Sequence, residues 1–345
     1  MNGQDRPAAP APIGGTVTVI GEAIVDLLPA GPGTAPRTFQ AVPGGSPYNV
    51  AVGLARLGHR AALMARLADT AFGRILSDHA RAEGIDLHAA PRAAEPSTLS
   101  VVSLDASGRA SYDFYLDGTA DWQWTAEETG RAPRDSAVLH FGSIASWTPP
   151  GSERIGDLAR SMRDRGGVLV TYDPNVRPGL LGDHHRGQRA VERAIGLAHL
   201  AKASTDDIAW LYPELAMADV AERWLGLGAA VVVITGGADG AWAFTAAASI
   251  RRPALDVAVV DTVGAGDSFT AGLIGSLIAR GLQAPADLAR CAAERLAPEL
   301  AGALDDAIVV ASLNCERRGN DPPTAADVAA ARDRLKALPP GLASD

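Results

Sequence analysis

The sequence is nearly free of lysine and carries no excess of positive charge. Lys202 and Lys336 are the only lysines in 345 residues, and neither follows a glycine or stands in a Val-Ala-Ile-Lys context. A Walker A phosphate-binding loop and the nucleotide-binding strand of protein kinases both need such a lysine, so both are excluded. The net charge of −9 argues against nucleic acid or an anionic membrane as a partner, because both need a basic footprint.

Cysteine and histidine are too few or too poorly spaced for a disulfide framework or a zinc site. The two cysteines, Cys291 and Cys315, are expected to be reduced thiols in a cytoplasmic protein. The adjacent His184 and His185 would point apart on a helix, and neither His-Glu-x-x-His nor Gly-x-Ser-x-Gly occurs. Residues 1–15 lack the apolar segment of a secretory signal, and no uncharged apolar run approaches the roughly 20 residues that span a bilayer. We therefore expect a soluble protein with no membrane partner.

Strand-like and helix-like segments alternate along most of the chain. The first strand is predicted at Thr16–Ile20. Further strands are predicted at 61–65, 137–141, 167–173, 199–204 and 230–235, and helices at 71–83, 152–165, 186–198 and 213–227. This alternation predicts an α/β fold with a parallel sheet covered by helices on both faces. Two short alternating runs, Leu99–Leu104 and 111–116, predict a hairpin connected by residues 105–108.

The composition gives no sign of a second domain. We expect a disordered tail at residues 1–15, a single α/β domain over 16–325, and a C-terminal helix and tail over 326–345. The Pro/Gly-rich stretch near 29–45 and the hairpin region 98–117 are expected to form a small β excursion from this body.

The segment Asp261-Thr-Val-Gly-Ala-Gly-Asp267 carries the strongest chemical signal. The apolar stripe that begins at Phe269 predicts a helix, so Gly264, Ala265, Gly266 and Asp267 lie at its start. Small residues leave backbone N–H groups uncovered there, and the helix dipole adds partial positive charge, which together make an anion site. Asp267 is then an acid beside bound phosphate, although an aspartate in such a place is more often only a helix cap. A dinucleotide fingerprint fits poorly, because Phe269 stands where its third glycine belongs.

A second cluster, Gly44-Gly45-Ser-Pro-Tyr-Asn49, precedes another helical stripe. Paired glycines allow a ligand to approach the backbone, and Asn49 offers a donor and an acceptor. By itself the cluster is more typical of a turn. Asp26, after the first strand, is equally ambiguous between a ligand contact and a solvated carboxylate.

Taken together, these segments resemble the ribokinase-like, PfkB-type carbohydrate kinases, and among them most resemble the fructokinases. The resemblance runs from about residue 17 to residue 321. It is supported by four further segments in matching order: Gly21-Glu22 with Asp26, Asp173-Pro-Asn175-Val-Arg177, Thr235 to Gly240, and Arg318 to Thr324. The resemblance implies a doubly wound, mostly parallel α/β sheet with a small β lid, and ATP-dependent phosphorylation of a primary hydroxyl of a sugar.

The resemblance also implies roles for individual residues. Asp267 would be the general base, and Gly264, Ala265 and Gly266 would form the anion hole. The sugar would be bound by Asp26, Gly44, Gly45, Asn49 and Arg177. The nucleotide would be flanked by Ser204, Asp207, Thr235, Gly237 and Gly240, with Asn314 in the adenine pocket. Asp261 would belong to a monovalent-cation loop, for potassium, and Asp207 would act on Mg²⁺ through water. A helix start with a neighbouring acid would supply charge neutralisation and a base without any lysine.

One departure from the family pattern affects chemistry. The usual Asn-x-x-Glu, associated with magnesium and the phosphates, is Ser204-Thr-Asp-Asp207 here, and a hydroxyl with a shorter carboxylate can act through the hydration shell that Mg²⁺ retains. Ala68, where the family usually has glycine, affects no chemistry.

Several functions stay open at this point. The acceptor could be fructose, or alternatively ribose, 2-keto-3-deoxygluconate or a nucleoside. A catalytically silent sugar- or nucleotide-binding protein on the same fold is a different class of function, against which the intact Gly-Ala-Gly-Asp267 argues. An NAD-linked oxidoreductase is less favoured because of the poor fingerprint. The hairpin is expected either to cover the sugar site or to contribute to a homodimer.

Overall fold

The computed structural model describes residues 15–29, 38–104, 110–294 and 297–337. The expected tail at 1–15, apart from its last residue, lies outside this range. So do the hairpin connection at 105–108, residues 30–37 of the 29–45 stretch, and the last eight residues of the chain.

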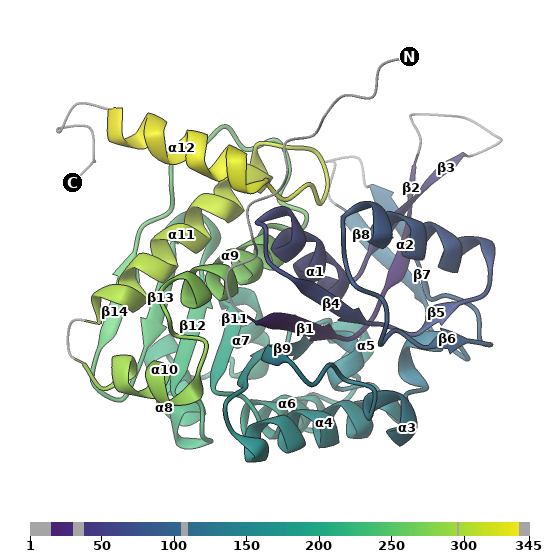
Figure 1. Cartoon of the computed structure of the whole chain (residues 1–345), viewed down its shortest axis with the longest axis horizontal. Helices are drawn as coiled ribbons and strands as arrows, with labels where there is room; N and C mark the ends of the chain where they lie inside the picture. The colour runs from purple at the N-terminus through teal and green to yellow at the C-terminus, as the bar shows by residue number, and fades with distance from the viewer. Residues whose placement is uncertain (1–14, 30–37, 105–109, 295–296, 338–345) are drawn as a thin grey trace.

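An eight-stranded sheet forms the centre of the molecule (Figure 1). Its spatial order is β14 (Ser249–Arg252), β13 (Ala241–Phe244), β12 (Val231–Thr235), β11 (Leu200–Ser204), β10 (Leu169–Asp173), β9 (Ser136–Gly142), β1 (Thr16–Ile20) and β4 (Ala61–Met64). The strands from β12 to β4 pair in parallel, and β13 and β14 add antiparallel at one edge. The predicted α/β fold with a mostly parallel sheet is thus confirmed.

Helices cover both faces of this sheet. One face carries α1 (Ser46–Arg56), α9 (Ala265–Ala279) and α11 (Pro298–Cys315), and the other carries α4 (Gly151–Arg165), α6 (His184–Ile195) and α8 (Met217–Gly226). Alternate residues of a strand enter different cores: Val231 and Val233 pack on the α9 side, and Val232 and Ile234 on the α4 side. Helix α9 is buried at every position from 268 to 278, because α1 and α11 enclose it.

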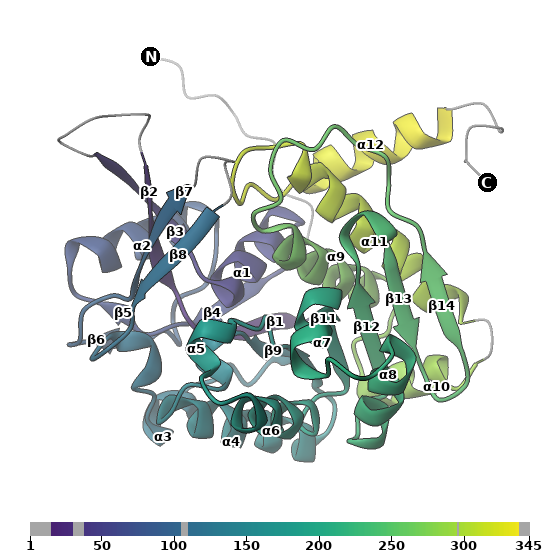
Figure 2. The same ribbon diagram turned by 180° about the vertical axis from the view of Figure 1, so that it is seen from behind.

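A second, four-stranded sheet projects from the body at the end of the molecule where α1 and α2 (Ala71–Ala82) lie (Figure 2). Its order is β3 (Phe39–Gly44), β2 (Ile24–Pro29), β7 (Leu99–Leu104) and β8 (Ala110–Tyr115). The predicted hairpin corresponds to β7 and β8. The small sheet also includes β2, which lies N-terminal to the expected 29–45 stretch except for its last residue, Pro29.

The buried carboxylate of Asp121 ties the small sheet to the body. It accepts hydrogen bonds from the backbone N–H of Ala23, just before β2, and from the hydroxyl of Thr98, just before β7. One side chain thus fixes both strands where they leave the body.

The helix predicted at 213–227 begins later than expected. Residues 205–211 form a separate helix, α7 (Thr205–Leu211), which ends before Pro213 because the residue preceding a proline disfavours helical geometry. The remaining elements are β5 (Leu67–Ala68), β6 (Arg92–Ala93), α3 (Ala126–Thr129), α5 (Pro178–Leu181), α10 (Pro285–Ala292), α12 (Ala325–Ala337) and three short 3₁₀ turns. Within the described ranges, none of the helices combines the length and the apolar character needed to cross a membrane.

Candidate active site

The residues singled out from the sequence gather where the parallel strands end. Asp173, Ser204 and Thr235 close β10, β11 and β12, which are neighbours in the sheet. Parallel strands end at one edge, and open α/β sheets bind their ligands outside that edge. Helix α9 begins at the same edge, because Gly266 in its first turn and the ends of β11 and β12 line one cavity.

The start of α9 has the features of an anion site. Gly264 has φ of 75°, and a Cβ added there would lie 2.0 Å from Asn320 Oδ1, so no other residue fits without movement. The backbone N–H groups of Gly264, Gly266 and Asp267 have no acceptor among the described residues, whereas the Ala265 N–H donates to the Thr262 carbonyl at 3.2 Å. Unpaired N–H groups at the positive end of a helix attract anions. The uncovered N–H groups expected here are thus present at 264 and 266, and that of Ala265 is already used.

Asp267 is held by the second sequence cluster. The Ser46 hydroxyl donates to Asp267 Oδ1 at 2.6 Å, and Asn49 Nδ2 donates to Oδ2 at 2.8 Å. Burial raises the pKa of Asp267, although these two hydrogen bonds and the charge of Lys202 oppose the rise. A carboxylate whose pKa is moved toward neutrality is better suited to accept a proton at working pH. Ser46, which the sequence interpretation did not include, therefore belongs to the site with Asn49.

Asp26 and the paired glycines lie on the small-sheet side of Asp267. A Cβ on Gly44 would lie 2.2 Å from Asp26 Oδ2, and a Cβ on Gly45, whose φ is 101°, would lie 2.7 Å from the Glu22 carbonyl. Burial raises the pKa of Asp26 to about 6, against the lowering effects of Ser100 and of the Arg177 charge. The exposed Arg177 donates to Asn175 Oδ1 at 2.9 Å. Close packing alone thus requires both glycines, and Arg177 acts on Asp26 through its charge.

A cavity of about 790 Å³ opens on the other side of the α9 start. Its polar lining includes Ser204, Asp207, Thr235, Gly237, Gly240 and Gly266, and its apolar lining includes Val257, Val259, Phe269 and Ile308. Gly240 is required by packing, because its φ is 91° and a Cβ would lie 2.1 Å from the Arg252 carbonyl. A mixed cavity of this size, next to unpaired N–H groups, has the room and the chemistry for a nucleotide.

Ser204 and Asp207 also form a local structural unit. Asp207 Oδ1 accepts from the Val176 N–H at 2.7 Å, and Oδ2 accepts from the Ser204 N–H and hydroxyl. The Ser204 hydroxyl in turn caps the Asp207 N–H, so the two residues make the capping box of α7. Both carboxylate oxygens therefore already accept hydrogen bonds, which favours contact with a metal ion through water over direct coordination.

Asn314 does not line the cavity. Its side chain is fully buried, and Nδ2 donates to the Val263 carbonyl at 2.8 Å, whereas its neighbours Ser312 and Cys315 do line the cavity. The side chain supports the 261–264 loop from behind, and the adenine contact expected for Asn314 stays a prediction.

Asp261 stabilises the same loop. Its two carboxylate oxygens accept from the N–H groups of Val263, at 3.1 Å, and Gly319, at 2.8 Å. Within the described ranges, no group of three or more His, Cys, Asp or Glu side chains is arranged to hold a metal ion. A cation at this loop would thus depend on backbone carbonyl oxygens.

Lys202 also lines the cavity, although the sequence interpretation gave it no role. Its Nζ lies 2.8 Å from Asp173 Oδ2, and both side chains are buried. The signal available in the sequence was a lysine within a short strand, 199–204, of a chain with only two lysines.

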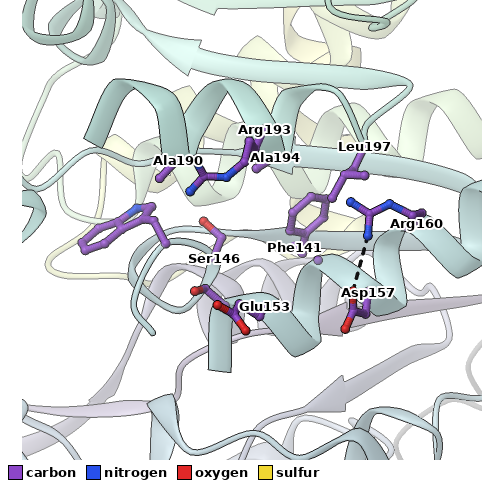
Figure 3. Close-up of a pocket in the computed structure, with 12 residues that line it drawn as sticks. Phe141, Ser146, Glu153, Asp157, Arg160, Ala190, Arg193, Ala194 and Leu197 are labelled. Carbon is purple, nitrogen blue, oxygen red and sulfur yellow. Dashed lines mark hydrogen bonds and ion pairs between the residues drawn. The ribbon is translucent and has the colours of Figure 1, made fainter. Parts of the chain in front are cut away.

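A further cavity of about 380 Å³ lies between α4 and α6, on the opposite face of the sheet (Figure 3). Glu153, Asp157 and Arg160 of α4 face Arg193 of α6 across it, and Leu197, just after α6, also lines it. It shares no lining residue with the larger cavity and contains none of the residues singled out from the sequence.

Comparison with known proteins gives a consistent set of relatives. The family described as pfkB family carbohydrate kinase matches residues 15–325. A fructokinase from Rhizobium leguminosarum bv. trifolii is 35% identical over 74% of this chain and 78% of its own length. An aminoimidazole riboside kinase from Salmonella typhimurium is 32% identical over 76% of this chain and 80% of its own length.

Two solved structures extend the similarity to the fold. A fructokinase from Xylella fastidiosa with bound ATP superimposes with a TM-score of 0.83 at 25% identity, covering 93% of this chain and 99% of that one. A fructokinase variant from Vibrio cholerae, bound to fructose, ADP and a potassium ion, superimposes with a TM-score of 0.78 at 25% identity over the same shares of the two chains.

Proposed function

Since this chain belongs to the PfkB family of carbohydrate kinases and is a sugar kinase, we propose that it phosphorylates a primary hydroxyl of fructose with ATP. The observation that carries the proposal is the position of Asp267. It lies in the first turn of α9, beside unpaired N–H groups, and is bonded to Ser46 and Asn49. A base between an anion site and a polar sugar pocket is what direct phosphoryl transfer to a hydroxyl requires.

In this proposal each part of the site has one task. Asp267 accepts the proton of the attacking hydroxyl, and the N–H groups of Gly264 and Gly266 stabilise the negative charge on the group that is transferred. ATP supplies that phosphoryl group. The Ala265 N–H contributes only if its 3.2 Å bond to the Thr262 carbonyl lengthens.

The sugar pocket is proposed to comprise Asp26, Gly44, Gly45, Asn49 and Arg177. Asn49 supports this, because its buried Oδ1 has no hydrogen-bond partner among the described residues and can accept from a sugar hydroxyl. Asp26 supports it too, since its carboxylate is partly buried and has only Ser100 and the charge of Arg177 to stabilise it. Fructose is favoured by the fructokinases among the relatives, and the aminoimidazole riboside kinase makes a riboside the second candidate.

The nucleotide is proposed to occupy the 790 Å³ cavity, with Ser204, Thr235, Gly237 and Gly240 along it. Because both oxygens of Asp207 are engaged, Mg²⁺ would arrive with the phosphates and reach Asp207 through water, in keeping with its retained hydration. Potassium is proposed for the loop at Asp261, supported by the potassium-bound fructokinase among the structural relatives. The two free thiols, Cys291 and Cys315, agree with a cytoplasmic location.

The small sheet is proposed to act as a lid over the sugar. Tyr112 on β8 supports this: Asp26 pairs with Ser100 and Ser100 with Phe114, so Tyr112, two residues from Phe114, lies on the same face of the small sheet as Asp26. The opposite side of the same sheet exposes Phe39 and Tyr115, at 43% and 61%, which favours a homodimer through the lid as an additional possibility.

The test is a coupled ADP-release assay with fructose, ribose, 2-keto-3-deoxygluconate and aminoimidazole riboside as acceptors, with the product identified by phosphorus NMR. We expect the highest kcat/KM with fructose and a phosphate ester on a primary carbon. A higher kcat/KM with a riboside would transfer the assignment to the second candidate. ADP release that no acceptor stimulates would contradict kinase activity toward these sugars.

A further inference from the structure

Lys202 is a buried ammonium group that the reaction described above does not use. Its side chain is 6% exposed, and its Nζ lies 2.8 Å from Asp173 Oδ2 and 3.5 Å from the Gly266 carbonyl. A Cβ added to Gly266 would approach Nζ to 3.3 Å. The ammonium group therefore lies directly beneath the first turn of α9, in the wall of the nucleotide cavity.

The surroundings keep this group charged. Burial works against the ammonium form, but Asp173, together with the charges of Asp207 and Asp267, outweighs it and raises the pKa of Lys202. A buried ion pair costs desolvation and is often no more stable than an apolar pair of similar volume. A structural tie between β10 and β11 is therefore a weak reason for a lysine at this place, and a catalytic task is a stronger one.

We propose that Lys202 is a catalytic residue whose ammonium group contacts the phosphoryl group as it is transferred. This rests on the proposed kinase function and adds a cation to the N–H groups of Gly264 and Gly266. The bond from the γ-phosphorus to the bridging oxygen breaks, and its electron pair stays on ADP. The sugar oxygen bonds to phosphorus, and its proton passes to Asp267. Lys202 exchanges no proton and serves only as fixed charge, held in place by Asp173.

Three variants separate this role from a structural one. Lys202→Met leaves the Asp173 carboxylate buried and unpaired, so it is expected to lower the melting temperature as well as the activity. Asp173→Asn keeps the ammonium group but leaves it without this partner, and the double variant Lys202→Met/Asp173→Asn removes both charges and should melt at a higher temperature than Lys202→Met. Because loss of one preorganised donor costs 10²–10³ in kcat, we expect the double variant to turn over at least about 100-fold more slowly than Asp173→Asn.

Two further readouts distinguish contact with the transferring group from folding. In calorimetry, the affinities of the double variant and Asp173→Asn for ADP alone should agree within about threefold. ADP with aluminium fluoride and fructose imitates the transition state, and the double variant should bind it about 100-fold more weakly than Asp173→Asn does.

The groups acting on the pKa of Asp267 are Ser46 and Asn49 from α1, Asp173 from β10 and Lys202 itself. Lys202→Met should therefore move the acid limb of the kcat profile to higher pH, because a cation that favours the Asp267 carboxylate is gone.

A double variant with kcat and aluminium-fluoride affinity within threefold of Asp173→Asn would overturn the proposal. This outcome differs from failure of the kinase function itself, in which the wild-type chain would phosphorylate no sugar in the panel. The calorimetric comparison needs no turnover, so it tests Lys202 separately.

Discussion

Gly264→Ala tests whether the backbone N–H groups at the start of α9 stabilise the transferred phosphoryl group, and Gly281→Ala is its matched control. Gly264 and Gly281 flank the two ends of α9 with nearly the same backbone angle, φ of 75° and 73°. Placing an alanine in the left-handed region costs about 1–2 kcal/mol at either site. A Cβ at 281 would meet no atom within 4 Å, whereas a Cβ at 264 would lie 2.0 Å from Asn320 Oδ1.

The two variants should therefore share a stability loss and differ in catalysis. Real Cβ contacts are essentially never shorter than 3.0 Å, so at position 264 the 2.0 Å approach requires Asn320 or the loop to move by at least about 1 Å. A displacement of this size at an anion hole is expected to cost about 100-fold in kcat, as loss of one donor does. Gly281→Ala should keep kcat within about twofold of wild type.

The measurements are chemical denaturation for both variants and steady-state kinetics with fructose and ATP. Equal kcat values for the two variants would refute the reasoning, because the backbone strain that they share would then account for any loss of kcat. A Gly264→Ala protein that fails to fold while Gly281→Ala folds would instead point to Asn320 packing, and Gly264→Ala combined with Asn320→Ala would then separate packing from catalysis.

The remaining predictions concern the sugar pocket, a buried acid and the small sheet. Asp26→Ala and Asn49→Ala should each raise the KM for sugar strongly and the KM for ATP little, because each leaves a buried sugar hydroxyl unpaired; equal effects on both KM values would remove the sugar assignment. Burial raises the pKa of Glu22 to about 7, so the folded state keeps its proton to higher pH than the unfolded chain. As pH rises from about 4.5 to 7, Glu22 should therefore lower the free energy of unfolding by about 3 kcal/mol. Denaturation of Glu22→Gln should show that much less pH dependence, and an unchanged slope would contradict the burial argument. Hydrogen exchange in β7 and β8 should slow when sugar alone is added if the small sheet is a lid, and unchanged protection would rule that motion out.

The sequence predicts the alternating body well because each parallel strand is a short apolar run between turn signals. The sequence is a poorer guide to elements whose formation depends on tertiary contacts. Strand β2 contains Asp26 and Pro29, which are unfavourable in strands, so the local sequence does not indicate it. The strand forms by pairing with β7, more than 50 residues away. Helix α7 is not predicted, because the pair that forms its capping box, Ser204 with Asp207, also fits a variant of a metal motif.

The same contrast applies to the site. Gly264 and Asp267 follow from a local pattern, because a helix start defines its own N–H groups and first-turn acid. Lys202 reaches the site only because β11 lies beside β10 and under α9. In the sequence its partner Asp173 is 29 residues away and Gly266 is 64 residues away, so a local pattern does not connect them. Asn314 is also hard to place from the sequence, since one position along α11 decides whether a side chain faces the cavity or supports the loop behind it.

The most direct test of the central claim is the turnover of Asp267→Asn with fructose and ATP, measured together with the affinity of each ligand. The substitution keeps the size of the side chain and its place beside Ser46 and Asn49 but removes the proton acceptor. The account predicts a fall in kcat of at least 100-fold with both dissociation constants nearly unchanged, because general-base catalysis contributes roughly 10²–10⁴-fold. A variant that retains more than about a tenth of the wild-type kcat would contradict the assignment of Asp267 as the base.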